Sequence, residues 1–211
     1  MTFRIAIFAS GEGTNAQRFI DYFGTTGNPV KTGLSEKEKN MVVSLLISDN
    51  PSSKALERAK RAGIAHLVVS AGDTRGEHGT MGLNTEVFTD FLKRNVDFIV
   101  LAGFLKLIPL PILKAFKDRI VNIHPALLPK YGGKGMYGNR VHEAVIANKE
   151  RKSGITIHLV NERYDEGKII FQKECLVNED DTVQSLAAKI HELEHRYYPE
   201  TVEKFIRSLP V

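Results

Sequence analysis

Apolar and polar positions alternate in blocks through the first half of the chain, and the blocks have the lengths of strands and helices. Continuous apolar runs occur at residues 3–9, 41–49, 66–70 and 97–104, as in strands that are buried on both faces of a sheet. Amphipathic segments of helical length lie between several of them. This alternation predicts β-α-β units, and hence a Rossmann-like, mostly parallel sheet with flanking helices.

The expected helices cover residues 16–23, 52–63 and 84–95, and a longer one runs from about residue 182 to 209. In the third helix, the periodicity places Val87, Phe88, Phe91 and Leu92 on one face. In the last, we expect an interruption at Pro199, because proline removes a backbone donor and clashes with the preceding turn.

The second half of the chain has a different pattern. Residues 119–124 form a fifth strand, residues 154–160 alternate, and residues 168–177 give another strand. We expect these later strands to be antiparallel additions at the sheet edge. Because there is no repeat or linker, the prediction is one domain, residues 1–211, of class α/β with a single mostly parallel sheet, flanking helices and antiparallel edge strands in the C-terminal half.

Composition narrows the class of protein. With 211 residues, 42% hydrophobic and 26% charged, the chain resembles an ordinary soluble globular protein, and no segment approaches the ~20 apolar residues that span a bilayer. The net charge of +4 is scattered, which gives little support to nucleic-acid binding but is compatible with a small anionic substrate. The N-terminus lacks a signal-peptide pattern, so a cytoplasmic location is expected. A lone cysteine, Cys175, excludes an intramolecular disulfide and is expected to be a packed thiol.

The segment SGEGTN, residues 10–15, follows the first strand and opens the first helix. It has two glycines of a dinucleotide-binding fingerprint but lacks the third. Its backbone N–H groups and the helix dipole favour an anion such as phosphate. The alternative is a tight turn in which Thr14 or Asn15 caps the helix, and local sequence does not choose between the two.

The segment RIVNIHPALLPKYGG, residues 119–133, carries the sharpest chemical signal. Asn122 and His124 are two residues apart on a strand and therefore point to the same face. A carboxamide N–H and an imidazolium that converge there could stabilise an oxyanion, and imidazole can also move protons near neutral pH. The alternative is a packed histidine whose ring bonds a backbone carbonyl.

Two further features are ambiguous from local sequence. Asp165 could raise the pKa of a neighbouring histidine, or could be one more solvated acid in a polar loop. The segment HELEH, residues 191–195, matches the H-E-x-x-H pattern of zinc proteases. The extended pattern with a third histidine fails, because Tyr198 stands at the glycine position and Pro199 follows. No metal is expected.

Several segments together resemble the phosphoribosylglycinamide formyltransferase family, the folate-dependent transferases of purine synthesis. They are FASGEGTN, VLAGFLKLIP, IVNIHPALLPKYGG, DEG and EHRYYP, and they occur in order over nearly the whole chain. The resemblance implies transfer of the formyl group of 10-formyltetrahydrofolate to the amine of glycinamide ribonucleotide. It also implies a nucleotide-binding half, residues 1–120, and a catalytic and folate-binding half, residues 121–211. The binding partners would be these small molecules, and neither nucleic acid nor a membrane. The protein would be a monomer or a homodimer.

The resemblance assigns roles residue by residue. Asn122 and protonated His124 would stabilise the oxyanion, and Asp165 would keep His124 protonated and help to relay protons. His158 matches another histidine near the catalytic centre. The binding residues implied are Gly13, Thr14, Asn15 and Glu194 for the nucleotide substrate, and Arg75, Leu105, Lys106, Leu107, Ile108, Asn122, Asn161 and Asp165 for the folate.

The chain also departs from the family pattern. The segment between Tyr131 and Ala144 is longer and richer in glycine, Lys106 stands where arginine is common, and residues 24–40 read as a polar surface loop. Competing functions are a formyl-folate hydrolase, a methionyl-tRNA formyltransferase, a zinc protease and a non-catalytic nucleotide-binding module. The first usually has an N-terminal regulatory domain and the second a C-terminal tRNA-binding domain, and neither is expected in this chain.

Overall fold

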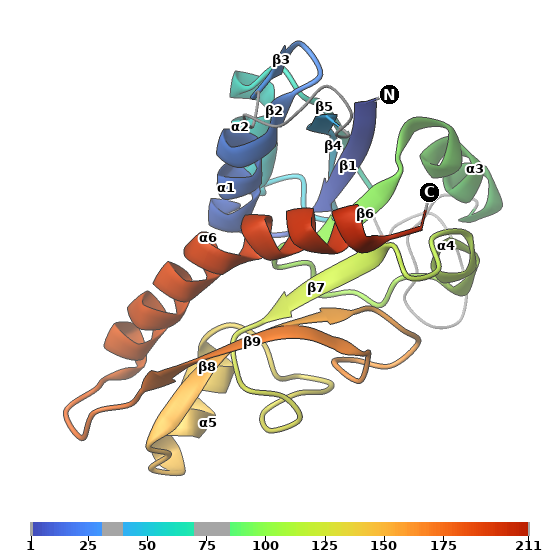
Figure 1. The fold of residues 1–211 in the computed structure, drawn as a ribbon. Helices are drawn as coiled ribbons and strands as arrows, with labels where there is room; N and C mark the ends of the chain where they lie inside the picture. Colours follow the sequence, from blue (N-terminus) through green and yellow to red (C-terminus); the bar gives the residue numbers. More distant parts are fainter. Residues whose placement is uncertain (1, 31–39, 70–84, 211) are drawn as a thin grey trace. The chain divides into compact units, whose positions relative to one another are not determined.

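The computed structural model describes residues 2–30, 40–69 and 85–210, and Figure 1 shows their fold. Contacts divide the chain into two compact units, Met1–Ile120 and Val121–Val211. The assignment of nucleotide binding to one half and catalysis to the other stays a prediction.

The first unit is built around parallel strands. Its strand order is β3-β2-β4-β1-β6, and β5 also pairs with β4. The bounds are β1 (Thr2–Phe8), β2 (Gly24–Thr25), β3 (Asn28–Pro29), β4 (Asn40–Ser48), β5 (Ala65–Val68) and β6 (Phe98–Leu101). The pairs of β1 with β4 and β6, and of β4 with β5, are parallel. Residues 5–8 of β1 are fully buried, because strands flank β1 on both sides and helices pack on the sheet.

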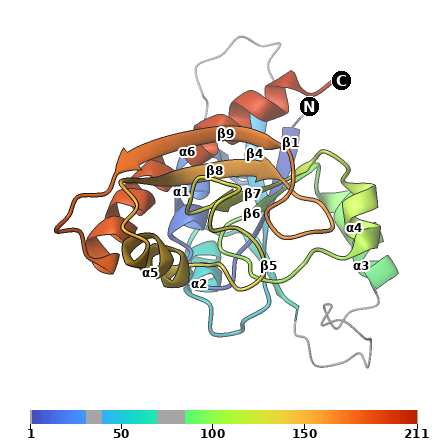
Figure 2. The ribbon, with the colours of Figure 1, turned by 90° about the horizontal axis from the view of Figure 1, so that it is seen from below.

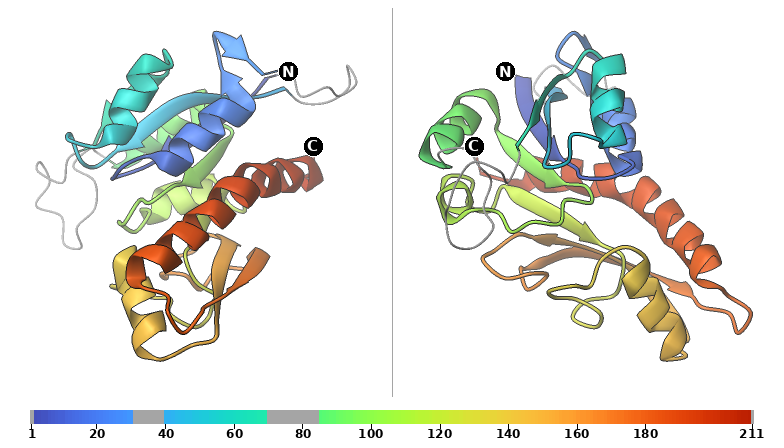
Figure 3. Two further views of the ribbon diagram at one scale, coloured as in Figure 1. Left: turned by 90° about the vertical axis from the view of Figure 1, so that its left-hand side faces the viewer. Right: turned by 180° about the vertical axis from the view of Figure 1, so that it is seen from behind.

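The described residues of the first unit form four helices: α1 (Thr14–Phe23), α2 (Lys54–Arg61), α3 (Thr85–Asn95) and α4 (Leu110–Ala115). Helices α1 and α2 pack against β4 and against each other, and Figure 3 shows them side by side. The Ser53 hydroxyl caps α2 by accepting from the N–H of Ala55. In α3 the expected apolar stripe is only half buried: Phe88 and Leu92 face the core, whereas Val87 is 65% exposed.

The second unit has three antiparallel strands, β7 (Ile120–His124), β8 (Lys152–Leu159) and β9 (Ile169–Leu176), seen in Figure 2. Two helices, α5 (Asn139–Ala147) and α6 (Val183–Ser208), pack against each other, and α6 also covers β8 and β9. Strand β8 is buried along almost its whole length rather than alternating. In β9, burial raises the pKa of the Cys175 thiol, which agrees with a packed and unreactive cysteine.

The predicted interruption of the last helix is wrong. Helix α6 runs through Pro199 without a break, as Figure 3 also shows. A capping box between Thr182 and Ser185 fixes its start. An interior proline removes only one backbone donor, and here Tyr198, Pro199 and Val202 are all buried. The packing of this apolar face therefore outweighs the local cost of the proline.

The predicted class is confirmed: the protein is α/β, with a mostly parallel sheet and antiparallel strands in its C-terminal half. Sequence patterns missed α4, α5 and the short β2–β3 hairpin, which occupies part of the expected loop at residues 24–40. Among the described helices, none is long and apolar enough to cross a membrane.

The connection from β8 to β9 requires glycine at position 167. A Cβ atom there would lie 1.6 Å from the Leu159 carbonyl oxygen, far inside van der Waals contact. The neighbouring N–H of Leu159 donates to the Lys168 carbonyl at 2.9 Å, which holds the two chain segments together. Because the clash would be with backbone, no side-chain rotation could relieve it.

We therefore expect Gly167→Ala to destabilise the protein by about 2 kcal/mol or more, since relief requires backbone movement in a packed region. Gly27→Ala is the matched control, because a Cβ at Gly27 meets no atom of the described residues within 4 Å. Denaturant unfolding of both variants measures the difference. Equal stability of the two variants would show that the β8–β9 connection relaxes freely.

Candidate active site

Strand β7 presents Asn122 and His124 on one face. The paired residues on β8 are His158 opposite Asn122 and Thr156 opposite His124. The antiparallel register therefore adds a second histidine to the pair that the sequence singled out. His124 and His158 are 3% and 2% exposed, so their ring contacts are made inside the protein.

His158 supports the amide of Asn122. Its Nδ1 lies 2.8 Å from the Leu159 carbonyl oxygen, to which it donates, and its Nε2 lies 3.2 Å from Asn122 Nδ2. In the neutral ring the proton is then on Nδ1, so Nε2 accepts from the amide. This bond fixes the orientation of the Asn122 carboxamide. A second, longer contact of 3.5 Å joins Asn122 Nδ2 to Asp165 Oδ1.

Asp165 brings the site together. Its Oδ2 accepts from the Gly133 N–H at 2.9 Å and lies 3.5 Å from His124 Nδ1. Its Oδ1 lies 3.5 Å from His158 Nε2. The side chain is 10% exposed, and its backbone φ of 58° places it in the left-handed region. Asp165 is thus part of a buried cluster and is not a solvated acid.

Burial and charge oppose each other in this cluster. Burial by itself would raise the pKa of Asp165, but the adjacent His158 ring, the charge of His124 and the Gly133 N–H together bring it below its ordinary value. Burial lowers the pKa of His124, and Asp165 and the Tyr131 carbonyl offset this only in part. The lowered pKa values of both groups favour an ionised carboxylate beside a neutral imidazole.

The second nitrogen of His124 has a backbone partner. His124 Nε2 lies 2.7 Å from the Tyr131 carbonyl oxygen, to which it donates. The hydrogen bond expected for a packed histidine is thus present. It occupies only Nε2, however, and leaves Nδ1 facing the Asp165 carboxylate. The ring is held at one edge and can exchange a proton at the other.

In the first unit, SGEGTN forms the turn into α1. Gly13 is the N-cap, with φ 70°, and a Cβ there would lie 2.7 Å from the Ala55 backbone. Of the two alternatives that the sequence left open, capping by Thr14 or Asn15 is not seen: these are the first two residues of the helix, and none of the described side chains caps it. The first turn therefore keeps backbone donors that an anion could use.

The expected folate segment follows β6. Leu105 and Leu107 are exposed, Ile108 is buried, and the Lys106 ammonium lies 3.4 Å from Asp49 Oδ2. Near the ends of β1 and β4, two buried polar atoms, Ser10 Oγ and Asp49 Oδ1, have no hydrogen-bond partner in the part of the chain that the structure describes. Such orphaned atoms suit a bound ligand, and local sequence gave no signal for either.

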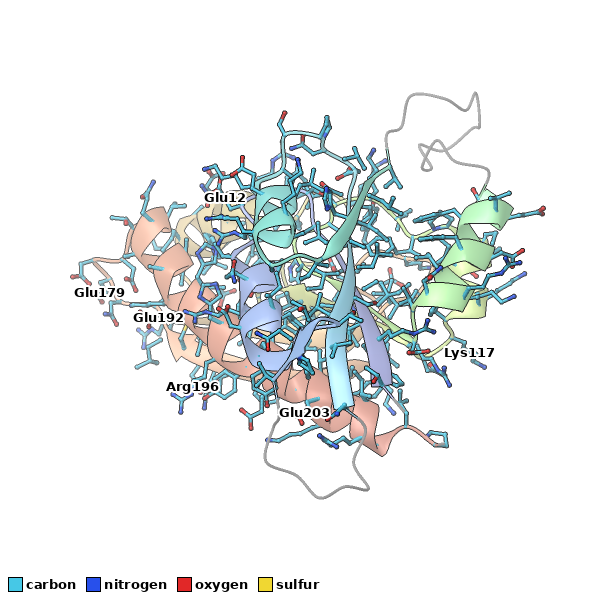
Figure 4. The ribbon with its side chains drawn as sticks, turned by 90° about the horizontal axis from the view of Figure 1, so that it is seen from above. Glu12, Lys117, Glu179, Glu192, Arg196 and Glu203 are labelled. Atoms are coloured by element: carbon cyan, nitrogen blue, oxygen red, sulfur yellow. The ribbon has the colours of Figure 1, made fainter. Side chains whose placement is uncertain are left out.

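The remaining candidates differ in setting. Glu194 is buried on α6, whereas Asn161 is exposed and its side chain accepts from the Arg163 N–H. Arg75 lies outside the described residues. Within HELEH, the rings of the two histidines stack 6.2 Å apart, and Glu192 projects outward from α6 beside Arg196 (Figure 4). Across residues 2–30, 40–69 and 85–210, no three His, Cys, Asp or Glu side chains form a potential metal site.

Comparisons with known proteins give one family. A model of the formyl transferase family matches residues 3–202. The chain is 30% identical over 203 residues to the phosphoribosylglycinamide formyltransferase of Bacillus subtilis (strain 168), and the match covers 96% of this chain and 94% of the relative. A crystal structure of phosphoribosylglycinamide formyltransferase from Bacillus halodurans has a TM-score of 0.79 and 36% identity, and the match covers 97% and 96% of the two chains.

Plant relatives are longer. The chloroplastic phosphoribosylglycinamide formyltransferase of Arabidopsis thaliana is 40% identical over 200 residues, or 94% of this chain. The match spans 64% of the length of that relative, and 60% of the one from Vigna unguiculata. Three findings agree: the match to the family model, the match over nearly the whole length of the bacterial relative, and the shared fold. The chain therefore belongs to the formyl transferase family.

Proposed function

We propose that the protein transfers the formyl group of 10-formyltetrahydrofolate to the amine of glycinamide ribonucleotide, a step of de novo purine (IMP) biosynthesis. The observation that carries the proposal is the convergence of Asn122 Nδ2 and His124 Nδ1 on the Asp165 carboxylate, each 3.5 Å from one of its oxygens, in the second unit. The family supplies the reaction class, and the names of the relatives support the acceptor.

In the proposed reaction the substrate amine attacks the formyl carbon directly. A C–N bond forms, the formyl oxygen becomes an oxyanion, and collapse breaks the bond to N10 of the folate. The proton that the amine loses ends on N10. No protein nucleophile takes part, in agreement with a lone cysteine whose pKa is raised.

Asn122 and His124 would stabilise the oxyanion. The longer of the Asn122 contacts, at 3.5 Å, is the one that a substrate oxygen can replace, because the bond to His158 holds the amide in place. The Tyr131 carbonyl engages Nε2 of His124, so Nδ1 is the edge that would donate to substrate. Asp165 would raise the proton occupancy of that edge and receive or return the proton, directly or through water.

Substrate binding is proposed for the residues that the resemblance assigned. The first turn of α1, at Gly13, Thr14 and Asn15, would hold the phosphate through backbone N–H groups. Glu194 would contact the ribose. The pterin of the folate would be held by Leu105, Lys106, Leu107 and Ile108. The loop from Asn161 to Asp165 would complete that pocket, and Arg75 would lie near the folate tail. The orphaned Ser10 and Asp49 oxygens support the presence of a polar ligand at the strand ends.

Location and assembly stay predictions. Two plant relatives are chloroplastic and another is bacterial, so relatives of this chain work in more than one compartment. For this protein we expect a cytoplasmic location. A monomer or a homodimer is expected, with small molecules as the partners.

We expect formyl transfer to require the amine and to be insensitive to chelators. Protein is mixed with 10-formyltetrahydrofolate, with and without glycinamide ribonucleotide, and the deformylated folate is followed by absorbance. Deformylation without the amine would indicate the hydrolase, and loss of activity with EDTA would indicate a metal enzyme. Binding of the nucleotide without any formyl transfer would favour the competing function, a non-catalytic nucleotide-binding module.

His124→Ala and Asp165→Asn should each slow the chemical step much more than they weaken nucleotide binding. The loss of an oxyanion donor typically lowers the rate by about 10²–10³-fold, because its bond strengthens in the transition state. Single-turnover rates and the nucleotide dissociation constant separate the two effects. Glu174→Gln, on exposed β9, is the control. Equal losses of rate and binding would contradict the assigned roles.

Asp165→Asn should also lower the pKa of His124 further. The carboxylate raises that pKa against burial, so removing its charge leaves burial to dominate. The donor form of His124 is the protonated form, which exists below the pKa. The fall of kcat with rising pH should therefore move to lower pH in the variant. Imidazole NMR titration and kcat profiles measure both shifts, and a rise in the His124 pKa would refute this role for Asp165.

A further inference from the structure

Tyr131 is held by hydrogen bonds at both its backbone and its phenol. Its backbone carbonyl accepts from His124 Nε2 at 2.7 Å, and its phenol donates to Glu150 Oε1 at 3.0 Å. The same Glu150 oxygen accepts from the Lys130 ammonium at 2.8 Å. A chain of contacts therefore runs from the carboxylate of Glu150, just before β8, through one tyrosine to the imidazole of His124.

The backbone of Tyr131 needs such support. Its φ is 58°, in the left-handed region that residues with a Cβ seldom adopt. Such a conformation persists where surrounding contacts enforce it. It is also the conformation in which the Tyr131 carbonyl reaches His124 Nε2. The segment that follows continues with Gly132 and Gly133, which provide little side-chain packing of their own.

Packing does not hold the tyrosine on every side. A pocket of about 400 Å³ lies in the second unit and is lined by Tyr131, Glu150 and Lys130 together with Leu127, Val145 and Ser153. A side chain that borders a pocket lacks neighbours on that side, so it can move more easily than one in a close-packed core. The hydrogen bond to Glu150 restrains it where packing is missing.

We propose that Glu150 is a positioning residue for His124, which it orients by holding the Tyr131 phenol and, through it, the Tyr131 carbonyl. Glu150 does not contact the reacting atoms itself, and it acts through Tyr131. The catalytic consequence rests on the proposed function, whereas the effect on the His124 ring does not. Lys130 assists by pairing with the same carboxylate oxygen, which lowers the pKa of Glu150 and keeps it an acceptor.

The alternative is an ordinary surface ion pair, and the same unit offers a matched example. Glu174 pairs with Lys152 at 2.9 Å, with side chains that are 58% and 55% exposed. The Glu150–Lys130 pair has a similar distance, 2.8 Å, but Glu150 is 26% exposed and also accepts from Tyr131. Exposed pairs contribute little to stability, so the added phenol contact is what distinguishes Glu150.

The experiment compares Glu150→Leu, Tyr131→Phe, Glu150→Gln and the control Glu174→Leu in the full chain. Imidazole NMR in ligand-free protein follows the exchange of the His124 Nε2 proton and the His124 titration. We expect faster exchange and a lower His124 pKa in Glu150→Leu and Tyr131→Phe, because both weaken the carbonyl contact that raises this pKa. Glu150→Gln keeps an acceptor for the phenol and should restore most of the wild-type behaviour, and Glu174→Leu should change nothing.

In formyl transfer we expect kcat to fall about 2- to 10-fold in Glu150→Leu and Tyr131→Phe with KM nearly unchanged, as for the loss of one supporting hydrogen bond. The double variant should be no worse than either single one, because both break the same chain of contacts. Unchanged His124 resonances in folded Tyr131→Phe, or equal effects of Glu174→Leu, would overturn the proposal. If the wild type lacks transferase activity, the proposed function fails, and the NMR comparison still decides the role of Glu150.

Discussion

The geometry of the candidate active site depends on the contacts of one buried group, the carboxylate of Asp165. It accepts from the backbone N–H of Gly133 and lies within 3.5 Å of His124 and His158. These partners come from β7, from β8 and from the loop after β7. A buried charge is tolerated only when its oxygens are bonded, so the carboxylate and its partners hold one another in place. One side chain thereby fixes the relative positions of three segments.

His124 lies between two acceptors inside a protein interior that disfavours its charge. Burial lowers its pKa, whereas the Asp165 carboxylate and the Tyr131 carbonyl each favour the protonated ring. A negative charge added at the Nδ1 edge favours the protonated ring in the same way as Asp165 does. In the reaction proposed above, the developing oxyanion would supply such a charge, and the imidazole would gain a proton at that step.

Sequence patterns predicted most of the regular structure and the central pair of the site. Buried parallel strands are continuous apolar runs, and the pattern located them correctly in the first unit. Helix α5 was missed because it follows a glycine-rich segment and has no cap from a described side chain, whereas the shorter α2 has a serine cap. The strand spacing of Asn122 and His124 shows that they share a face, but it cannot show that His158 pairs across from them, because that depends on long-range register.

The contacts that orient His124 could not be found from local sequence, because most of them involve backbone groups. The Tyr131 carbonyl and the Gly133 N–H belong to every peptide unit, and only their placement gives them a role. Both Tyr131 and Asp165 adopt left-handed backbone conformations, which residue type does not predict. Each conformation is stabilised by a side-chain contact made across many residues of sequence, to Glu150 for Tyr131 and to Gly133 for Asp165. The glycine-rich segment therefore starts at the Tyr131 carbonyl, which accepts from His124, and includes the Gly133 N–H, which donates to Asp165, so its first residues make both orienting contacts.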